Sequence, residues 1–270
     1  MKTKTKLKVR TEHIFDVGAN EGIDGLAQAL YNRDCFIHAF EPNPELIKTI
    51  KKLKKKIELK KGVNLDNYKI YKCAVSDKNN YTYFYISKNH RVSSLNRLSN
   101  EIDNSWPGYK NSHFKVIKKI KIKVINLYDF IVKNNIKNIR YLKIDTQGND
   151  LKVLKGLKSA VKIVLQGKLE IALNLKRSAY KNVNTLKDAK KFFLNSPLKI
   201  IKIKKIEHIS NNKKLYNEAD VYFKNRNFEK TNNLSFNYNN RYFYRLLNNK
   251  RSLKDKILDF FIRAKNLYLN

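Results

Sequence analysis

The sequence has few of the residues that break or cross-link a chain: 8 Gly, 4 Pro and 2 Cys among 270 residues. So little glycine and proline excludes a collagen-like chain and a fold made mostly of loops. The two cysteines, Cys35 and Cys73, lie far apart in apolar surroundings, so we expect two reduced thiols and no disulfide. Neither Cys-x-x-Cys nor a Cys/His zinc pattern is present, and we expect no bound metal.

Long apolar runs are also missing. No stretch reaches the roughly 18 apolar residues that span a bilayer, and the basic N-terminus lacks the apolar segment of a signal peptide. We therefore expect a cytoplasmic protein. With 42% hydrophobic residues the chain is expected to fold, and its length suits one large domain, or one domain with an appendage.

Acidic residues are scarce beside basic ones. The chain has 58 Lys+Arg against 23 Asp+Glu, a net charge of +35, which attracts nucleic acid, anionic lipid or an acidic substrate. The lysines are spread along the chain and do not cluster with aromatic residues in one segment, a pattern also typical of compositional bias. The charge alone therefore selects no partner.

The first 42 residues contain the strongest structural pattern. An apolar run over 13–17, a helical pattern over 23–31 and a second apolar run over 35–42 predict strand, helix and strand. This order predicts a βαβ unit with parallel strands. Beyond it we expect an amphipathic helix over 45–61, a third strand over 68–77, an additional strand or hairpin over 81–87 and a long irregular connection over 87–114.

The second half continues the alternation of strands and helices. We expect strands over 120–125, 140–145 and 162–173, and helices over 127–134, 150–161 and 185–194. Two last strands, over 199–209 and 218–225, predict an antiparallel hairpin. The whole pattern predicts an α/β fold with a mostly parallel seven-stranded sheet, helices on both faces and a C-terminal hairpin. We expect a basic tail over 1–12, one domain over 13–226 and a basic helical extension over 227–270.

The loop after the first strand, residues 16–22, suggests a cofactor. A dinucleotide site would need a second glycine two residues after Gly18, but Asn20 stands there, which disfavours nicotinamide and flavin cofactors. S-adenosylmethionine has no pyrophosphate, so this loop suits it. We expect Asp16 to meet its amine, directly or through a water, and the N–H groups of the loop, with the helix N-terminus, to meet its carboxylate. The loop residues in question are Gly18, Ala19, Asn20 and Gly22.

Two further segments complete this expected site. Glu41 ends the second strand, 19 residues after Gly22, where a carboxylate accepts both ribose hydroxyl hydrogens. Pro42 then turns the chain and Asn43 supports the turn. We expect the segment after the third strand to border the adenine ring: Ala74, Val75 and Ser76. Because these separate signals agree in order and spacing, they predict S-adenosylmethionine as cofactor.

These segments resemble the FkbM-type methyltransferases. The similar segments are DVGANEG, FEPNP, AVSD, SSL, LKIDTQGNDLKVLKGL and the later Glu170, and the resemblance covers about residues 13–225. It implies a class I, Rossmann-like methyltransferase that O-methylates a hydroxyl, often on a sugar or a polyketide-derived product. The chain departs from the family at Asn126–Asp129, where Thr-Leu-Asp is usual, and around residues 169–180.

Methyl transfer to a hydroxyl needs the acceptor held in line, and a positioned base contributes about 10²–10⁴-fold. Asp145 is the first candidate base, because it ends the fourth core strand, where α/β sheets bind ligands; its alternative role is to cap loop 146–148. Glu170, on the next strand, would orient the acceptor, share a metal with Asp145 or be structural. His90 and His113 are alternative bases or surface histidines, and Ser93-Ser94 is expected to fix its loop.

The leading hypothesis is an O-methyltransferase acting on a glycan or another small-molecule acceptor. An RNA methyltransferase is the alternative that the charge favours, but the base-gripping Asn/Asp-Pro-Pro-Tyr tetrapeptide is replaced by residues 145–148, Asp-Thr-Gln-Gly. A non-catalytic cofactor-binding module is a third reading. The sequence leaves the oligomeric state open.

The last segment, residues 241–268, has an apolar stripe between basic residues. This pattern predicts a helix that lies on the anionic inner membrane surface, or that packs on the domain or on another subunit. The stripe consists of Leu246, Leu247, Leu253, Ile257, Leu258, Phe261, Ile262 and Leu267.

Overall fold

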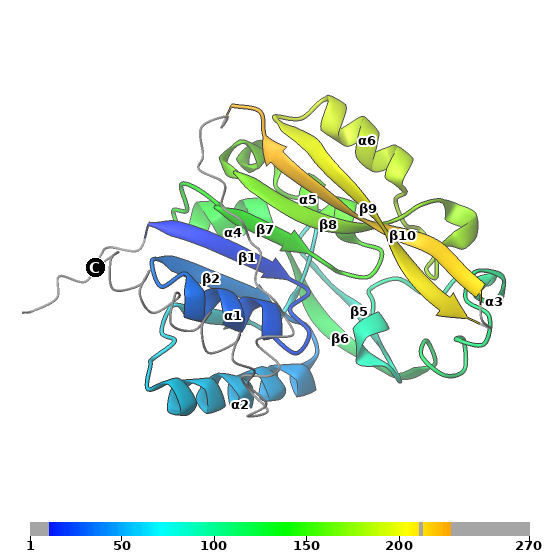
Figure 1. The fold of residues 1–270 in the computed structure, drawn as a ribbon, viewed down its shortest axis with the longest axis horizontal. Helices are drawn as coiled ribbons and strands as arrows, with labels where there is room; N and C mark the ends of the chain where they lie inside the picture. Colours follow the sequence, from blue (N-terminus) through cyan, green and yellow to red (C-terminus); the bar gives the residue numbers. More distant parts are fainter. Residues whose placement is uncertain (1–10, 211–212, 228–270) are drawn as a thin grey trace, which may run out of the picture.

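The computed structural model describes residues 11–210 and 213–227, which form two β-sheets with helices around them (Figure 1). The larger sheet has seven strands in the order β3-β2-β1-β7-β8-β10-β9, and the smaller has three in the order β4-β6-β5. The strands are β1 (Glu12–Val17), β2 (Cys35–Phe40), β3 (Tyr68–Tyr71), β4 (Ala74–Ser76), β5 (Asn80–Ser87), β6 (Val116–Asn126), β7 (Tyr141–Ile144), β8 (Gln166–Ala172), β9 (Leu198–Ser210) and β10 (Lys213–Asn225).

The large sheet confirms the predicted fold class. β1 pairs in parallel with β2 and β7, and β3 and β8 extend the parallel set on either side. β10 runs antiparallel to both β8 and β9, so the C-terminal hairpin is confirmed. The chain passes from β1 outward to β3 and then returns to β7 on the other side of β1. Such a reversal opens a crevice at the carboxyl ends of the strands.

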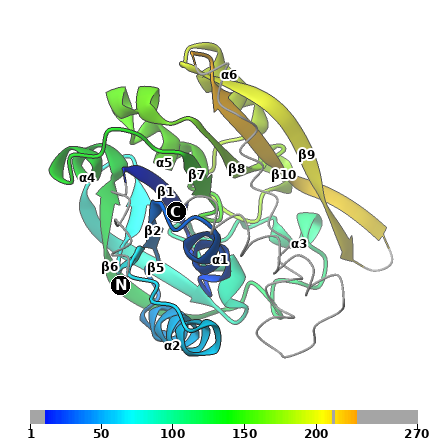
Figure 2. The ribbon, with the colours of Figure 1, turned by 60° about the vertical axis from the view of Figure 1, so that its left-hand side comes forward.

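Helices cover both faces of this sheet (Figure 2). On one face α1 (Ile23–Tyr31) and α2 (Pro44–Lys61) pack through fully buried side chains such as Leu26, Ile50 and Ile57. On the other face lie α4 (Leu127–Lys133), α5 (Asp150–Lys155) and α6 (Leu186–Leu194), which share a larger core with the sheet. The period of the apolar residues along each helix therefore decides which side it buries.

The predicted third strand over 68–77 is wrong as a single element. β3 ends at Tyr71 in the large sheet, and β4 begins at Ala74 and pairs in parallel with β6 in the small sheet. The N–H of Cys73 donates to the carbonyl of Tyr71 at 3.0 Å, and this tight turn separates the two strands. A continuous apolar run does not reveal such a change of sheet.

Two other predictions need correction. The connection over 87–114 is not simply irregular: it holds η1 (His90–Val92) and α3 (Ile102–Ser105), and Ile102, Trp106 and Phe114 are buried against the segment 179–183. The helix predicted over 150–161 ends at Lys155, because the backbone of Gly156 lies against β4; a 3₁₀ helix, η2 (Lys158–Ile163), follows. A third 3₁₀ turn, η3 (Leu175–Arg177), follows β8.

Both cysteines are buried and free. Within the described part of the chain no helix is long and apolar enough to cross a membrane. Most of the predicted 1–12 tail and the 227–270 extension, with its apolar stripe, lie outside the described residues. The domain boundaries, the cytoplasmic location and the membrane contact therefore stay predictions.

Candidate active site at the carboxyl edge of the sheet

A cavity of about 370 Å³ lies at the carboxyl edge of the large sheet. The loop after β1, the end of β2, the segment after β7 and the small sheet all contribute to its walls. The lining comprises Val17, Gly18, Ala19, Asn20, Glu21, Ile23, Asp24, Phe40, Glu41, Pro42, Leu46, Ala74, Val75, Phe84, His90, Arg91, Ser93, Leu95, Lys143, Asp145, Thr146 and Gln147.

The loop after β1 is fixed to the end of β2 through its backbone. The N–H groups of Gly18 and Ala19 both donate to the carbonyl of Phe40, at 3.1 and 3.0 Å, and the N–H of Asn20 donates to Glu41 Oε2 at 2.7 Å. The N–H of Gly22 donates to the Ala19 carbonyl at 2.8 Å. These four donors, which the sequence analysis assigned to a ligand carboxylate, are thus bonded within the protein.

Gly18 is required where β1 and β7 end side by side. Its φ is 77°, and a Cβ at this position would lie 1.8 Å from the carbonyl oxygen of Asp145. Only a residue without a side chain fits such an approach. The glycine therefore brings the loop after β1 and the segment of Asp145 to the same cavity.

Glu41 is almost completely buried, with 4% of its surface exposed, and it lines the cavity. Its Oε1 accepts from the N–H of Asn43 at 2.8 Å, while Oε2 accepts from Asn20. Burial raises the pKa of Glu41 to about 7, although these two hydrogen bonds lower it. Each carboxylate oxygen keeps a second lone pair, so two hydroxyl groups still find acceptors here.

Four predicted cofactor residues lie outside the lining and support it. Gly22 precedes α1, and Asn43 caps α2 by accepting from the Glu45 N–H at 3.1 Å. Ser76 is buried beside Asn149, with 3.3 Å between Oγ and Oδ1. The fourth, Asp16, forms a buried ion pair. The other predicted cofactor residues, namely Gly18, Ala19, Asn20, Glu41, Pro42, Ala74 and Val75, line the cavity.

The ion pair of Asp16 joins it to Lys143 of β7, which the sequence analysis missed. Lys143 Nζ lies 3.0 Å from Asp16 Oδ1 and 3.6 Å from Asp24 Oδ2. Burial alone would lower the pKa of Lys143, but the carboxylates of Asp16 and Asp145 raise it well above its ordinary value. The ammonium therefore stays charged and occupies one oxygen of Asp16, the residue expected to meet the ligand amine.

Asp145 lines the cavity directly after β7. Gln147 Nε2 donates to Asp145 Oδ1 at 3.0 Å and also to Glu170 Oε1 at 3.1 Å. Glu170, on β8, lies outside the cavity lining, and burial together with Glu218 and Asp145 raises its pKa well above the ordinary range. Glu170 thus contacts Asp145 only through the Gln147 amide.

The alternative role considered for Asp145, capping loop 146–148, belongs to Asp150. Its two carboxylate oxygens accept from the N–H groups of Thr146 and Gly148, at 2.8 and 3.1 Å. Burial and the nearby Asp145 raise the pKa of Asp150 to about 7. Because the neighbouring aspartate holds the loop, the carboxylate of Asp145 remains at the cavity.

Gln147 is itself held firmly. Its φ is 58°, an unfavourable value for a residue with a side chain. Ser94 Oγ donates to its carbonyl at 2.6 Å. Ser93 and Ser94 also fix their own loop, as expected: their Oγ atoms accept from the N–H groups of Ser87 and Asn96, at 3.1 and 3.0 Å. The side chain of Tyr180 lies 3.1 Å from Gln147 Oε1, and its hydroxyl donates to the Val92 carbonyl at 2.7 Å. Gln147 and Tyr180 were missed because no sequence pattern links them.

The two candidate histidines differ in position. His90 lines the cavity, and with Arg91 it faces Glu21 across the mouth, at 3.5 and 3.3 Å. His113 lies outside the lining, and its ring contacts Asn89 at 3.2 Å. Only His90 is thus placed to meet a ligand.

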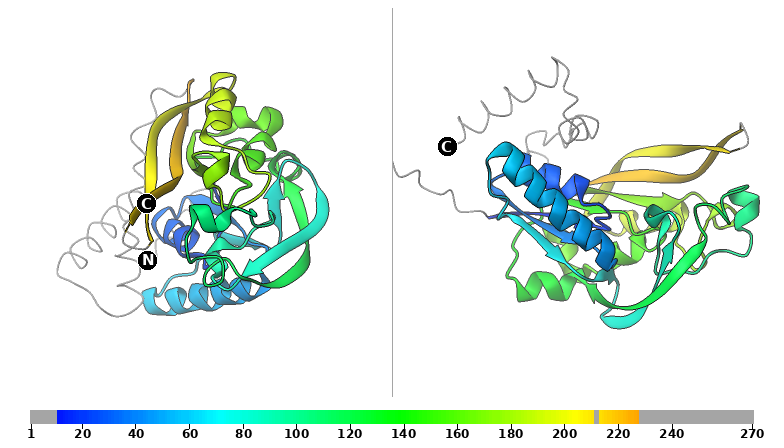
Figure 3. Two further views of the ribbon diagram at one scale, coloured as in Figure 1. Left: turned by 90° about the vertical axis from the view of Figure 1, so that its right-hand side faces the viewer. Right: turned by 90° about the horizontal axis from the view of Figure 1, so that it is seen from below.

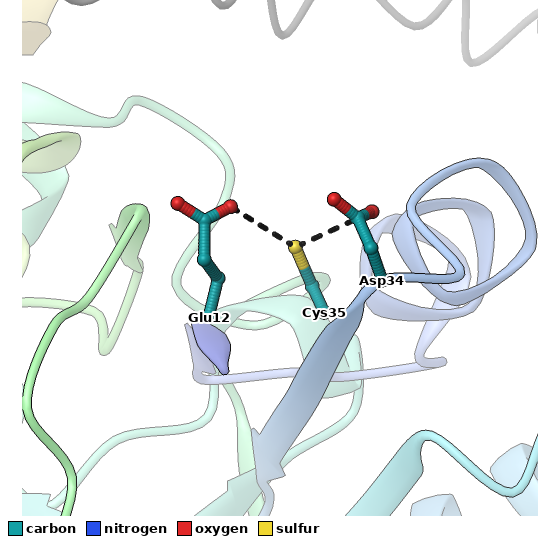
Figure 4. A group of neighbouring side chains, drawn as sticks. All are labelled: Glu12, Asp34 and Cys35. Carbon is teal, nitrogen blue, oxygen red and sulfur yellow. Dashed lines mark hydrogen bonds between the residues drawn. The ribbon is translucent and has the colours of Figure 1, made fainter. Parts of the chain in front are cut away.

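Away from the cavity, Glu12, Asp34 and Cys35 bring their ligand-type atoms within 4.8 Å of one another (Figure 4). The Arg140 guanidinium lies 3.0 Å from Glu12, 3.2 Å from Asp34 and 3.3 Å from the Cys35 sulfur. Burial raises the pKa of Cys35 to about 12, so its thiol stays protonated. The Arg140 guanidinium already contacts all three side chains, and we assign the group a structural role.

The chain matches a known family over most of its length. A profile of the methyltransferase FkbM domain matches residues 16–230, a range that includes every residue of the cavity lining. The chain belongs to the FkbM methyltransferase family. Family membership confirms the resemblance to FkbM-type methyltransferases that the motifs indicated. No curated protein matches the chain significantly.

Several solved structures are similar to this FkbM methyltransferase. The FkbM methyltransferase from Methylobacillus flagellatus is 15% identical, with a TM-score of 0.45, over 82% of this chain and 45% of that one. TrmK from M. capricolum, in complex with S-adenosyl-homocysteine, is 10% identical, with a TM-score of 0.40, over 96% and 92%. A putative RNA methyltransferase from Pyrococcus horikoshii is 9% identical, with a TM-score of 0.39, over 80% and 76%. This chain thus spans less than half of the M. flagellatus protein.

Proposed function

We propose that this FkbM methyltransferase transfers a methyl group to a hydroxyl oxygen of a glycan or another small-molecule acceptor. One observation carries the proposal: the Asp145 carboxylate lines the same cavity as the loop of Gly18 and the carboxylate of Glu41. In-line transfer requires the methyl donor and the base that deprotonates the acceptor to share one cavity.

The cavity residues fit the donor. The cavity volume of about 370 Å³ lies within the range of roughly 300–1,000 Å³ usual for small-ligand sites. Val75 and Phe84 offer apolar surface for the adenine ring, and the free lone pairs of Glu41 suit two ribose hydroxyls. When bound, S-adenosylmethionine supplies an electrophilic methyl group on a positively charged sulfur.

We assign the role of general base to Asp145. Its Oδ1 accepts from Gln147, so the second oxygen is the one available to a hydroxyl proton. As the acceptor oxygen attacks, this carboxylate takes its proton. Glu170 serves as the positioning residue, because it accepts from the same Gln147 amide and fixes its orientation from the far side.

Labelled methyl transfer into separate polysaccharide, lipid and RNA fractions tests this proposal. We expect label in polysaccharide or another small-molecule fraction, and its loss in Asp145→Asn. Label confined to RNA would overturn the acceptor class. Intact donor binding with no label in any fraction would instead favour a non-catalytic module.

A further inference from the structure

The outer face of the small sheet carries tyrosines opposite lysines. In the antiparallel pairing of β5 and β6, three successive outward positions match Tyr81 with Lys123, Tyr83 with Lys121, and Tyr85 with Lys119. Of the intervening side chains, Phe84 and Ile122 are buried in the core beneath the sheet, and Ile120 is partly buried against it. We call the six outward residues the Tyr–Lys ladder.

Five of the six ladder residues are exposed, whereas Tyr85 is half-buried and its hydroxyl accepts from Arg97 Nε at 3.0 Å. Tyr81 and Tyr83 are 67% and 48% exposed, and all three lysines are exposed. Lys119 Nζ lies 3.7 Å from the centroid of the Tyr83 ring. Within 11–210 and 213–227, no ion pair involves any of the three lysines. Exposed aromatic rings beside unpaired positive charges indicate an interaction surface.

The sequence shows no clustering of lysines with aromatic residues in one segment, and the ladder is indeed built from two segments. The tyrosines and the lysines lie on either side of the 87–114 connection, and only the register of β5 against β6 brings them together. In Figure 3 the two strands lie at the periphery, on the side away from the β9–β10 hairpin. The net charge of the chain is thus partly organised on one face.

We propose that the Tyr–Lys ladder binds a linear acidic glycan, whose sugars carry carboxylate or phosphate groups. Alternate residues of a strand are roughly 6.8 Å apart, so three lysines span about 14 Å, which suits a chain of several units better than a monomer. The Tyr81 ring, which is 67% exposed, offers a flat apolar face with a polar hydroxyl at its edge, and such a face packs against the C–H groups of sugars.

One contact distinguishes an acidic sugar from a nucleobase. A base-binding platform leaves its aromatic faces open for stacking. Here the Lys119 ammonium lies over the Tyr83 ring, where a stacked base would have to displace it. An anionic group on a sugar binds this ammonium where it stands, so the geometry favours the glycan over a base stacked on Tyr83.

The ladder adjoins the cavity. Phe84, on the inner side of β5, lines the cavity, and Tyr85 pairs with Ser94, whose neighbours Ser93 and Leu95 also line it. A chain on the Tyr85 end therefore lies beside the segment that forms the cavity wall. That this docked chain is also the methyl acceptor rests on the proposed function, whereas the docking surface itself does not.

Affinity electrophoresis through gels that contain polygalacturonate tests the ladder, with neutral dextran and a single-stranded oligothymidylate as comparison probes. Lys119→Gln/Lys121→Gln/Lys123→Gln removes three charges from the ladder. The matched control, Lys51→Gln/Lys52→Gln/Lys55→Gln, removes three from the exposed side of α2. Tyr81→Ser/Tyr83→Ser removes the rings without changing the charge, and circular dichroism checks the fold of each variant.

We expect polygalacturonate, and not dextran, to retard the wild type. The ladder variant should bind on the order of tenfold more weakly, the tyrosine variant several-fold more weakly, and the α2 variant as the wild type does. Equal losses in the two lysine variants would show that diffuse charge binds the polymer, and would overturn the proposal. If the ladder triple variant does not fold, the single variant Lys121→Glu is compared with Lys52→Glu on α2. Weaker binding in Lys121→Glu alone supports the ladder, and equal losses in both variants overturn it.

Two further results separate the alternatives. Stronger retardation by oligothymidylate, lost on removal of the tyrosines, would assign the ladder to nucleic acid and overturn the glycan. Retained polygalacturonate binding without methyl transfer to any glycan would support the ladder while contradicting the proposed function.

Discussion

The cofactor side and the acceptor side of the cavity are built differently. On the cofactor side, Gly18, Asn20 and Glu41 come from one βαβ unit and are held by backbone hydrogen bonds. On the acceptor side, Gln147 joins Asp145 to Glu170, and side chains from the 87–114 connection and from the segment after β8 hold Gln147. The first side is local in sequence and the second is not, so they should respond differently to mutation.

The largest effect is expected at Gly18, where the two sides meet. Gly18→Ala places a Cβ against the Asp145 carbonyl. We expect no measurable cofactor binding, and a free energy of unfolding lower by about 4 kcal/mol or more, measured by urea denaturation. Gly62→Ala is the matched control: its φ is also positive, at 63°, but nothing lies within 4 Å of the added Cβ. It should cost only about 1 kcal/mol. Equal costs would contradict the close approach.

Asp145→Asn should separate chemistry from cofactor binding. We expect kcat to fall by about 10²–10⁴-fold, because the asparagine does not accept the hydroxyl proton. The Kd for S-adenosylhomocysteine should change less than about twofold, since the cofactor side is held independently. Asp103→Asn, at an exposed aspartate paired with Lys110, serves as control. A kcat close to the wild-type value would remove Asp145 from the chemistry.

Glu41 should give the cofactor side a pH dependence. Its pKa of about 7 in the free protein means that ribose hydroxyls meet mostly protonated carboxyl at pH 6 and mostly carboxylate at pH 8. Since the carboxylate is the better acceptor, adenosine should bind about tenfold more tightly at pH 8 by calorimetry. Adenosine is the probe because it lacks the amino-acid group of the full cofactor.

Glu41→Gln is the companion variant. It should weaken adenosine binding by about 10- to 100-fold at pH 8, because a hydrogen bond to a charged group is lost, and its binding should not vary between pH 6 and 8. A pH dependence that persists in this variant would assign the titration to another group.

The smallest effect is expected on the acceptor side, at Tyr180→Phe. The variant loses the hydroxyl that donates to the Val92 carbonyl at 2.7 Å and lies 3.1 Å from Gln147 Oε1, so the Gln147 side chain is held only through its Nε2. We expect about 1 kcal/mol less stability and a several-fold lower kcat, with cofactor affinity unchanged. A loss of cofactor affinity instead would mean that the two sides are coupled.

The same contrast explains what could be predicted from the sequence. The βαβ unit, the hairpin and Glu41 follow from apolar periods and from residues spaced within one turn or one unit. The turn at Cys73 was missed because the apolar run continues through it. Asp150, and not Asp145, caps loop 146–148, and two nearby aspartates cannot be distinguished by spacing. Lys143, Gln147 and Tyr180 enter the site through long-range contacts, and the Tyr–Lys ladder through strand register; neither leaves a local pattern.

A crystal structure with S-adenosylhomocysteine tests the central claim most directly, which is that the cavity between Glu41 and Asp145 holds the methyl donor. We predict that both ribose hydroxyls lie within hydrogen-bonding distance of the Glu41 carboxylate, that the adenine ring lies against Val75, and that the sulfur faces Asp145. A ligand bound elsewhere, or a Glu41 carboxylate that contacts only Asn20 and Asn43, would contradict it.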